Sequence, residues 1–588
     1  MNLQQAIRSG LNPVEHLAST LGHNDKSDIR FRERILRKLP IRFLSPVASQ
    51  YQQKFETQGR REANLMLLGI GQKLDDAILP PASTDEDIRR FAKLRAEACR
   101  KVYLRASSLN EAYRSISAYV RSFGLEALKV GRKYDLYGAV MRMADEFWWR
   151  RRLRKTFGRS VETIAIGQGL VRKQAGIYAS DETVSRRTEQ KARVNHMLDE
   201  MEAVNELDQS YTLRELQALS VSNPKIRRSE LMTRIAGFEE YAQDNGHIGL
   251  FCTITCPSRM HPRLSRSGEE NPKYDGTTPD QAQAYLNKQW SKIRAAFQRE
   301  EIAPYGFRVA EPQHDATPHW HLLIFLPPEQ AARTKAIMRH YALEIDGQEP
   351  GADQYRFDAK NIDWSKGTAA GYIAKYISKN IDGHGVDLDL HGHDAKDSAI
   401  RVDAWKAVWG IRQFQQIGGP PVTIWRILRN LSDVPTEGLA LEAYQAADQG
   451  DWRGYMEIMG GHTLKKSDWP IGLLRRDIET LNRYGEPIGQ AIVGVTVGQE
   501  TYRSKIHIWE IRLKPASDDP YTDSRYVNVT LRNVTDSAKA TVLEDVYIEG
   551  SLEAPTHDLD QDLEQPRNRD RLSEKRAGFD SGPLEFCQ

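Results

Sequence analysis

The sequence predicts an α+β protein in which helices and strands occupy different stretches of the chain. Residues 86–129 carry apolar side chains at spacings of three and four, as amphipathic helices do. Residues 247–262, HIGLFCTITCPSRMHP, alternate threonine with apolar residues before a proline, which indicates a buried strand. Residues 306–327 predict two further strands joined by a tight polar turn at 314–317. Helices are therefore expected first, and paired strands in the middle of the chain.

A chain of 588 residues is too long for one hydrophobic core, so several domains are expected. The patterns predict a helical region over 1–240, a central domain of strands and helices over 241–430, and a mixed α/β region over 431–550. The first region is a candidate for DNA or partner binding. The tail over 551–588 is rich in charged residues, Pro and Gly, which is typical of disorder.

The 83 basic and 80 acidic residues nearly cancel, so nucleic-acid binding has to be sought in local patches. Residues 148–159, WWRRRLRKTFGR, contain six basic residues and no acidic one. Two interpretations stay open for this stretch. In the first, its basic side chains bind the phosphates of a nucleic acid and its tryptophans stack on bases. In the second, it is a solvated helix face with the tryptophans in the core.

The compartment is expected to be the cytoplasm. The four cysteines, Cys99, Cys252, Cys256 and Cys587, form no CxxC pair and no plausible disulfide framework. The N-terminus lacks the apolar stretch of a signal peptide, and no apolar run is long enough to span a bilayer.

Three helices are predicted around the paired strands. Thr278-Pro279-Asp280-Gln281 combines a capping box with proline at the first helical position, and this helix should run to about Arg299. Another should begin at about Glu329. The third is predicted over 366–383, with Asn380 and Gly383 available to end it.

His319 and His321 are candidate metal ligands, because residues two apart on a strand point to the same face while Trp320 packs behind them. Glu311 should lie opposite them across the hairpin and could supply a carboxylate oxygen, although it could also be a surface acid. His314 in the turn is a competing third ligand. Two imidazoles and a carboxylate leave open positions that suit Mg²⁺ or Mn²⁺ and a phosphate substrate. A second such pair, His391 and His393, is expected in an exposed loop.

Tyr372 and Tyr376 are four residues apart on the predicted helix and therefore share a face, with Lys375 and Lys379 at the same spacing. Such a pair is compatible with ordinary packing and with a pair of nucleophiles. The helix begins with small residues, which would let a backbone or a DNA strand approach closely. A phenol with a pKa near 10 is mostly protonated at neutral pH and is therefore a poor nucleophile. A metal that polarises the phosphate and a lysine that favours phenolate would offset this.

Three blocks in this order resemble the HUH superfamily of single-strand endonucleases that initiate rolling-circle replication: FCTITCP (251–257), PHWHLLIF (318–325) and YIAKYISKN (372–380). The sequence is most similar to the replication gene A proteins of temperate tailed phages, and this likeness extends through WGIRQFQQIGGPPVTIW (409–425). The resemblance implies a small antiparallel sheet flanked by helices, with His319 and His321 on a central strand. It implies that Tyr372 and Tyr376 are the nucleophiles and that 241–430 is the endonuclease domain.

The same resemblance implies a metal-dependent nicking and rejoining enzyme. A tyrosine attacks origin DNA, leaving a covalent 5′-phosphotyrosine and a free 3′-OH. Lys375 or Lys379 stabilises the negative charge of the phosphate. Single-stranded or supercoiled origin DNA is the expected substrate. The chain has no GxxxxGK[ST] loop, so a host helicase and the replication machinery are expected partners. A transposase or relaxase, and a non-catalytic DNA-binding protein, stay open as alternatives.

Overall fold

The computed structural model describes residues 9–75, 77–131, 133–365, 367–382, 394–504 and 507–514. The side chains of Lys375 and Lys379 fall outside this description, although their backbone is described. The second histidine pair, His391 and His393, and the predicted tail over 551–588 also lie outside the described residues.

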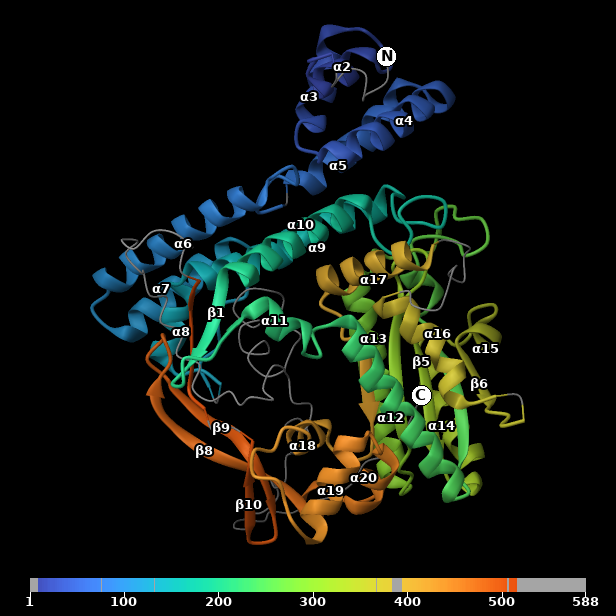
Figure 1. The fold of residues 1–588 in the computed structure, drawn as a ribbon. Coiled ribbons are helices and arrows are strands. Elements are labelled where there is room, and N and C mark those ends of the chain that lie inside the picture. The colour runs from blue at the N-terminus through green and yellow to red at the C-terminus, as the bar shows by residue number, and fades with distance from the viewer. Residues whose placement is uncertain are drawn as a thin grey trace, which may run out of the picture.

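The N-terminal region is helical, as predicted, and Figure 1 shows its helices from α2 to α10 in blue to green. Their bounds are α2 (Pro13–Thr20), α3 (Lys26–Leu36), α4 (Ile41–Gln58), α5 (Arg60–Asp75), α6 (Asp85–Arg105), α7 (Leu109–Ser122), α8 (Leu136–Met143), α9 (Glu146–Gly167) and α10 (Asp181–Glu200). Side-chain caps fix where several of them start. Thr84 and Asp87 form a reciprocal capping box at α6, and Asp145 caps α9.

A short sheet interrupts the region that was predicted to be mostly helical. Strands β1 (Met201–Asn205) and β2 (Ser210–Thr212) pair with each other, and β1 also pairs with β11 (Trp509–Leu513) at the far end of the described chain. Helices α11 (Leu213–Ala218) and α12 (Pro224–Asp244) follow. A partner so distant leaves no local signal in the periodicity of the sequence.

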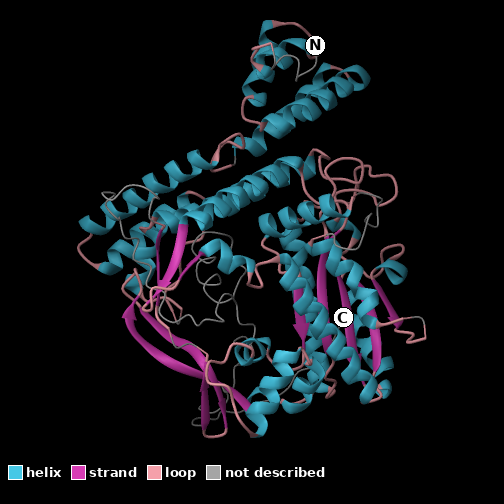
Figure 2. Ribbon diagram, in the orientation of Figure 1, coloured by secondary structure: helices cyan, strands magenta, loops and turns pink. Residues whose placement is uncertain are grey.

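The central sheet has five strands in the order β6-β3-β5-β4-β7, and all neighbours are antiparallel. The strands are β3 (Ile248–Ile254), β4 (Tyr305–Pro312), β5 (Pro318–Leu326), β6 (Phe357–Asn361) and β7 (Phe414–Ile417). The predicted strand and the predicted hairpin are therefore confirmed, and β5 is the middle strand. In Figure 2 this sheet lies apart from the two three-stranded sheets.

Helices cover both faces of the central sheet (Figure 1). They are α12, α13 (Pro279–Arg299), α14 (Ala331–Leu343), α15 (Ala352–Tyr355), α16 (Ala369–Ile381) and α17 (Ala395–Trp409). Trp320, Leu322 and Ile324 of β5 are buried in one core with α13 and α14. Leu323 and Phe325 are buried in a second core with α12 and α16. This alternation follows from the two-residue period of a strand.

The predicted helices have nearly the expected bounds. The capping box of Thr278 and Gln281 is present, and α13 ends at Arg299 as predicted. Helix α14 begins at Ala331 after a short 3-10 turn, slightly later than predicted. Helix α16 ends at Ile381, between Asn380 and Gly383, the two residues expected to be available to end it. The Asn380 amide donates to Glu311 and to the Tyr376 carbonyl, so it does not act as a cap, and Gly383 lies outside the described residues.

The described C-terminal part is mixed, as predicted, with α18 (Val422–Leu428), α19 (Gly438–Gln449), α20 (Trp452–Ile458), β8 (Ile471–Leu481), β9 (Pro487–Val497) and β10 (Glu500–Arg503). Residues 515–550 of the predicted mixed region lie outside the described residues. The turn between β8 and β9 contacts the N-terminal helices. Glu486 forms an ion pair of 2.6 Å with Arg142 of α8, and Arg483 pairs with Asp145. Segments distant in sequence are thus held side by side.

The two tryptophans of the basic stretch 148–159 lie in the core. Trp148 and Trp149 are 4% and 0% exposed, and the Trp149 indole donates to the Met143 carbonyl at 2.8 Å. Stacking of these rings on bases is therefore excluded. The expected solvated face is not found either, because Lys155 is the one exposed cation of the stretch and the others are partly buried. Cys99, Cys252 and Cys256 are free and buried. No helix in the described ranges is long and apolar enough to cross a membrane.

Replacing Trp320 by alanine should remove the packing that fixes the histidine strand, because this indole is fully buried and donates to Gln283 at 3.0 Å. We expect a loss of about 3–5 kcal/mol in the free energy of unfolding, measured by denaturant titration. Leu104→Ala, at a side chain that is 79% exposed, is the control and should change stability by less than about 0.5 kcal/mol. Equal stability of the two variants would contradict this packing role.

Candidate metal centre and tyrosine helix

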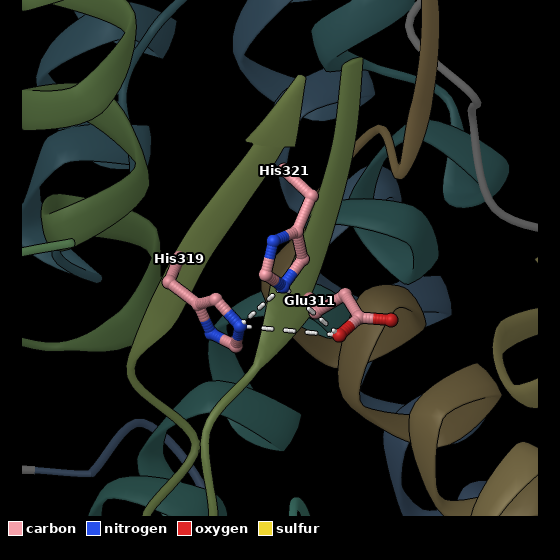
Figure 3. A group of neighbouring side chains, drawn as sticks. All are labelled: Glu311, His319 and His321. Atoms are coloured by element: carbon pink, nitrogen blue, oxygen red, sulfur yellow. Dashed lines mark hydrogen bonds and ion pairs between the residues drawn. The ribbon is translucent and has the colours of Figure 1, made fainter. Parts of the chain in front are cut away.

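The β4–β5 hairpin brings together Glu311, His319 and His321, as predicted. Glu311 is the direct cross-strand partner of His319. The two Nε2 atoms lie 2.9 Å apart, and Glu311 Oε2 lies 3.6 Å from His321 Nε2 and 3.9 Å from His319 Nε2 (Figure 3). The ligand atoms of all three residues lie within 4.8 Å of one another. This is a compact cluster of two nitrogens and one oxygen.

The cluster fits a divalent cation. The Glu311 side chain is fully buried, and a buried carboxylate is costly unless a positive charge compensates it. The alternative of Glu311 as a surface acid is therefore wrong. His321 Nδ1 lies 3.0 Å from Thr253 Oγ1 of the neighbouring strand. A proton on Nδ1 that donates to this hydroxyl leaves Nε2 with its lone pair directed at the cluster, as in metal-binding histidines.

His314 does not join these ligands. It lies buried in the hairpin turn, where burial lowers its pKa. Its neighbour Asp315 instead accepts from His261, with Nδ1 and Oδ2 3.1 Å apart. Burial raises the pKa of Asp315, but the charge and hydrogen bond of His261 outweigh this and hold it at about 2. The turn thus has its own polar network, and Glu311 is the third member of the cluster.

Two residues outside the predicted set orient the Glu311 carboxylate. The Asn380 amide of α16 donates to Glu311 Oε1 and also to the Tyr376 carbonyl. The Gln413 amide donates in turn to Asn380 Oδ1 at 3.0 Å. Asn380 follows Tyr376 by one helical turn, so its shared face was readable from the sequence. Gln413 gave no local signal.

Tyr376 lies against the cluster. Its ring centroid is 4.4 Å from that of His321, and it stacks on Phe251 at 5.5 Å. Burial raises the pKa of Tyr376, and the negative charge of Glu311 raises it further. Tyr372, one turn earlier on α16, is 38% exposed. The two tyrosines thus share one helix but differ in environment.

The start of α16 is anchored to α12 by a buried carboxylate. Glu239 accepts from the backbone N–H groups of Ala369 and Ala370 at 2.8 and 2.9 Å. A carboxylate at a helix N-terminus satisfies free donors and interacts favourably with the helix dipole. Ala369 is itself fully buried, so the small residues here serve close helix packing.

Asn380→Ala should leave Glu311 less well oriented and weaken Mn²⁺ binding by about 10- to 100-fold, as loss of an outer hydrogen bond to a metal ligand commonly does. The affinity can be measured by calorimetric titration of the purified protein. Asn361→Ala, on the exposed edge strand β6, is the matched control and should bind Mn²⁺ like wild type. An unchanged affinity in Asn380→Ala would show that this hydrogen bond does not prepare the site.

Comparison with known proteins identifies the family. The chain matches the family described as bacteriophage replication gene A protein (GPA) over residues 93–384. It is 33% identical over 578 residues to the probable replication protein P12 of Pseudoalteromonas phage PM2, covering 89% of each chain. It is 42% identical over 372 residues to the replication gene A protein of Escherichia phage 186, covering 61% of this chain and 54% of the relative.

A third relative, named a probable replication endonuclease from a prophage-like region of Salmonella paratyphi A, is 37% identical over 298 residues, covering 50% of this chain and 37% of the relative. The chain thus spans about half the length of the phage 186 protein and less of the Salmonella protein. No solved structure matches it significantly. The extent of the match to the phage PM2 protein shows that the chain belongs to the bacteriophage replication gene A protein family.

Proposed function

We propose that this protein is a site-specific, single-strand DNA endonuclease of the HUH type that initiates rolling-circle replication of a phage genome. The observation that carries the proposal is the contact between Tyr376 and His321 within the cluster of Glu311, His319 and His321. A nucleophile candidate beside a candidate metal centre is what cleavage of a phosphodiester requires. The replication and endonuclease names of the relatives support the same activity.

The proposed reaction is a transesterification. The phenolic oxygen of Tyr372 or Tyr376 attacks the scissile phosphorus, an O–P bond to tyrosine forms, and the bond from phosphorus to the 3′ oxygen breaks. The phenol loses its proton and the leaving 3′ oxygen gains one. The products are a 5′-phosphotyrosine and a free 3′-OH that can prime synthesis. One phosphate ester replaces another, so rejoining needs no ATP.

Glu311, His319 and His321 would hold the metal ion. When bound, Mg²⁺ or Mn²⁺ supplies Lewis-acid polarisation of the scissile phosphate. The chain's own contribution is orientation: Asn380 fixes the carboxylate of Glu311, and Thr253 fixes the imidazole of His321. Lys375 and Lys379 are proposed to steady the phosphate charge.

Two tyrosines on one helix suit an enzyme that must cut twice. The first tyrosine keeps the 5′ end covalently bound while the second cuts the regenerated origin. Tyr376 is half-buried against the cluster and Tyr372 is more exposed, so the two present their hydroxyls differently. Single-stranded or supercoiled origin DNA is the proposed substrate. The sequence lacks a GxxxxGK[ST] loop, so a host helicase is the proposed partner for strand separation.

The alternative of a non-catalytic DNA-binding protein requires both tyrosines to be core residues. Tyr372, with 38% of its surface exposed, does not meet this requirement. A transposase or relaxase would use the same site for strand transfer. Membership in the replication gene A family favours replication initiation over both alternatives.

Changing both tyrosines, Tyr372→Phe with Tyr376→Phe, should abolish the covalent protein–DNA adduct because no attacking oxygen remains at the site. The adduct is measured on a denaturing gel with end-labelled origin DNA and Mn²⁺. Each single variant should still form an adduct through the remaining tyrosine. Tyr355→Phe, at a ring that is 62% exposed on α15, is the control and should react like wild type. An adduct that survives the double change would refute the proposed nucleophiles.

His319→Ala should reduce nicking of supercoiled origin DNA to background, because the metal loses one of three ligands. EDTA should have the same effect on wild type, and added Mn²⁺ should reverse it. His340→Ala, at an exposed histidine of α14, should nick normally. Undiminished nicking by His319→Ala, or by wild type in EDTA, would overturn the metal role.

A further inference from the structure

A basic cleft lies away from the tyrosine site, where α9 and α10 meet the start of α6 and the end of α17. Its volume is about 630 Å³. Nine of its lining residues are Arg or Lys and four are Asp or Glu. Figure 1 shows α9 and α10 running side by side, with α17 below them. The whole chain is nearly neutral, so this local excess of positive charge is a property of the cleft.

Several of the lining cations have structural partners. Arg154 forms a two-pronged pair with Asp85 at 2.7 and 2.8 Å. Arg187 donates to Asp403 of α17 at 2.9 Å. These pairs connect α9 to α6 and α10 to α17, so they fix the walls of the cleft.

Arg150 has no such partner. Among the described residues no carboxylate lies within ion-pair distance of its guanidinium, and its Nε is buried without a hydrogen bond. Burial lowers the pKa of Arg150 to about 10, and repulsion from Arg154 and Arg89 adds to the effect. Asp85 and Glu146 act in the opposite direction, and the guanidinium lies over the Phe147 ring at 4.6 Å. Because no carboxylate pairs with Arg150 directly, a further anion in the cleft would stabilise its half-buried charge.

The positive surface continues beyond the cleft. A second cavity of about 370 Å³ shares Glu86, Arg89 and Arg150 with the first, and its further charged residues are Arg90 and Lys93 of α6 and Glu146 of α9. The two cavities therefore meet at Arg150. Several cations distributed over two adjoining cavities suit a ligand with repeated negative charges better than one isolated anion.

The dimensions and lining narrow the class of ligand. A volume of about 630 Å³ lies within the roughly 300–1,000 Å³ of cavities that enclose one small ligand, so a few nucleotides of one strand are of the right size for it. Phe157 is the aromatic residue of the lining, and it is 7% exposed with Arg186 over its ring. Contact would therefore be made with phosphates and not by stacking on bases.

We propose that this cleft, with Arg150 at its centre, binds the sugar-phosphate backbone of single-stranded DNA without reading its sequence. It would hold a strand at a distance from the tyrosines. The inference rests on the proposed function only in the choice of DNA as the polyanion.

The test is binding of a fluorescently labelled oligothymidine, measured by anisotropy at several salt concentrations. It uses full-length protein that carries Tyr372→Phe and Tyr376→Phe, without metal, so that cleavage plays no part. Adding Arg89→Gln, Arg150→Gln and Arg193→Gln should raise Kd at least tenfold. It should also reduce the slope of log K against log salt by about 2, since each lost phosphate contact in single strands contributes roughly 0.7.

Arg105→Gln with Arg114→Gln, at exposed positions of α6 and α7, is the matched control and should keep both Kd and slope. Thermal unfolding checks that each variant is folded. If the triple variant has a lower Tm than wild type, the Kd and salt slope of the single variant Arg150→Gln test the proposal instead. Arg150→Lys should retain most of the affinity. Inorganic phosphate at millimolar concentration should compete poorly, whereas strong competition would show a site for a free anion and overturn the proposal.

The outcome is separable from that of the proposed function. Unchanged Kd and slope in the cleft variants, with normal adduct formation by wild type, would refute DNA binding by the cleft. The proposed nuclease activity would be unaffected by that result. Weakened binding in the cleft variants, with no adduct from wild type on any origin DNA, would refute the nuclease and leave the cleft as a DNA-binding site.

Discussion

The antiparallel pairing of β4 with β5 is the constraint on which the candidate site depends. It sets Glu311 opposite His319 and places His321 two residues further along the same face. Because side chains alternate across a strand, a slip of one residue would turn both histidines into the opposite core and expose Trp320 to their side. Trp320 opposes such a slip, since it is fully buried, donates to Gln283 and lies 3.8 Å below the Arg308 guanidinium.

The tyrosine helix is positioned by two buried carboxylates that act at its opposite ends. Glu239 accepts from the first N–H groups of α16, where the helix dipole favours negative charge. Glu311 is held by Asn380 near the other end, where the dipole disfavours it. A positive charge nearby would offset the cost of this second arrangement. The electrostatics of the helix and of the histidine cluster therefore both favour a cation at Glu311.

The sequence predicted those parts of the site that local periodicity determines. The hairpin, the shared face of His319 and His321, and the bounds of α13 depend on neighbouring residues, and all were predicted. The sequence indicated Asn380 only as a residue that could end the helix, and its hydrogen bond to Glu311 was missed, because a cap and a tertiary hydrogen bond use the same amide. Gln413 and the pairing of β1 with β11 depend on contacts between distant segments, which no window of sequence contains.

The basic stretch 148–159 shows why local charge alone does not predict a binding surface. Its residues lie on one helix, so the helical period distributes them over different surroundings. Trp149 points into the core, Arg150 into the cleft, and Arg159 toward helices α13 and α17 of the central sheet. Arg159 donates to the last carbonyls of α17 and to Asp280 in the first turn of α13, so it joins the two regions. One charged segment thus packs into the core through Trp149, connects two regions of the protein through Arg159 and lines the cleft through Arg150. The position of each residue around the helix decides which of these roles it has.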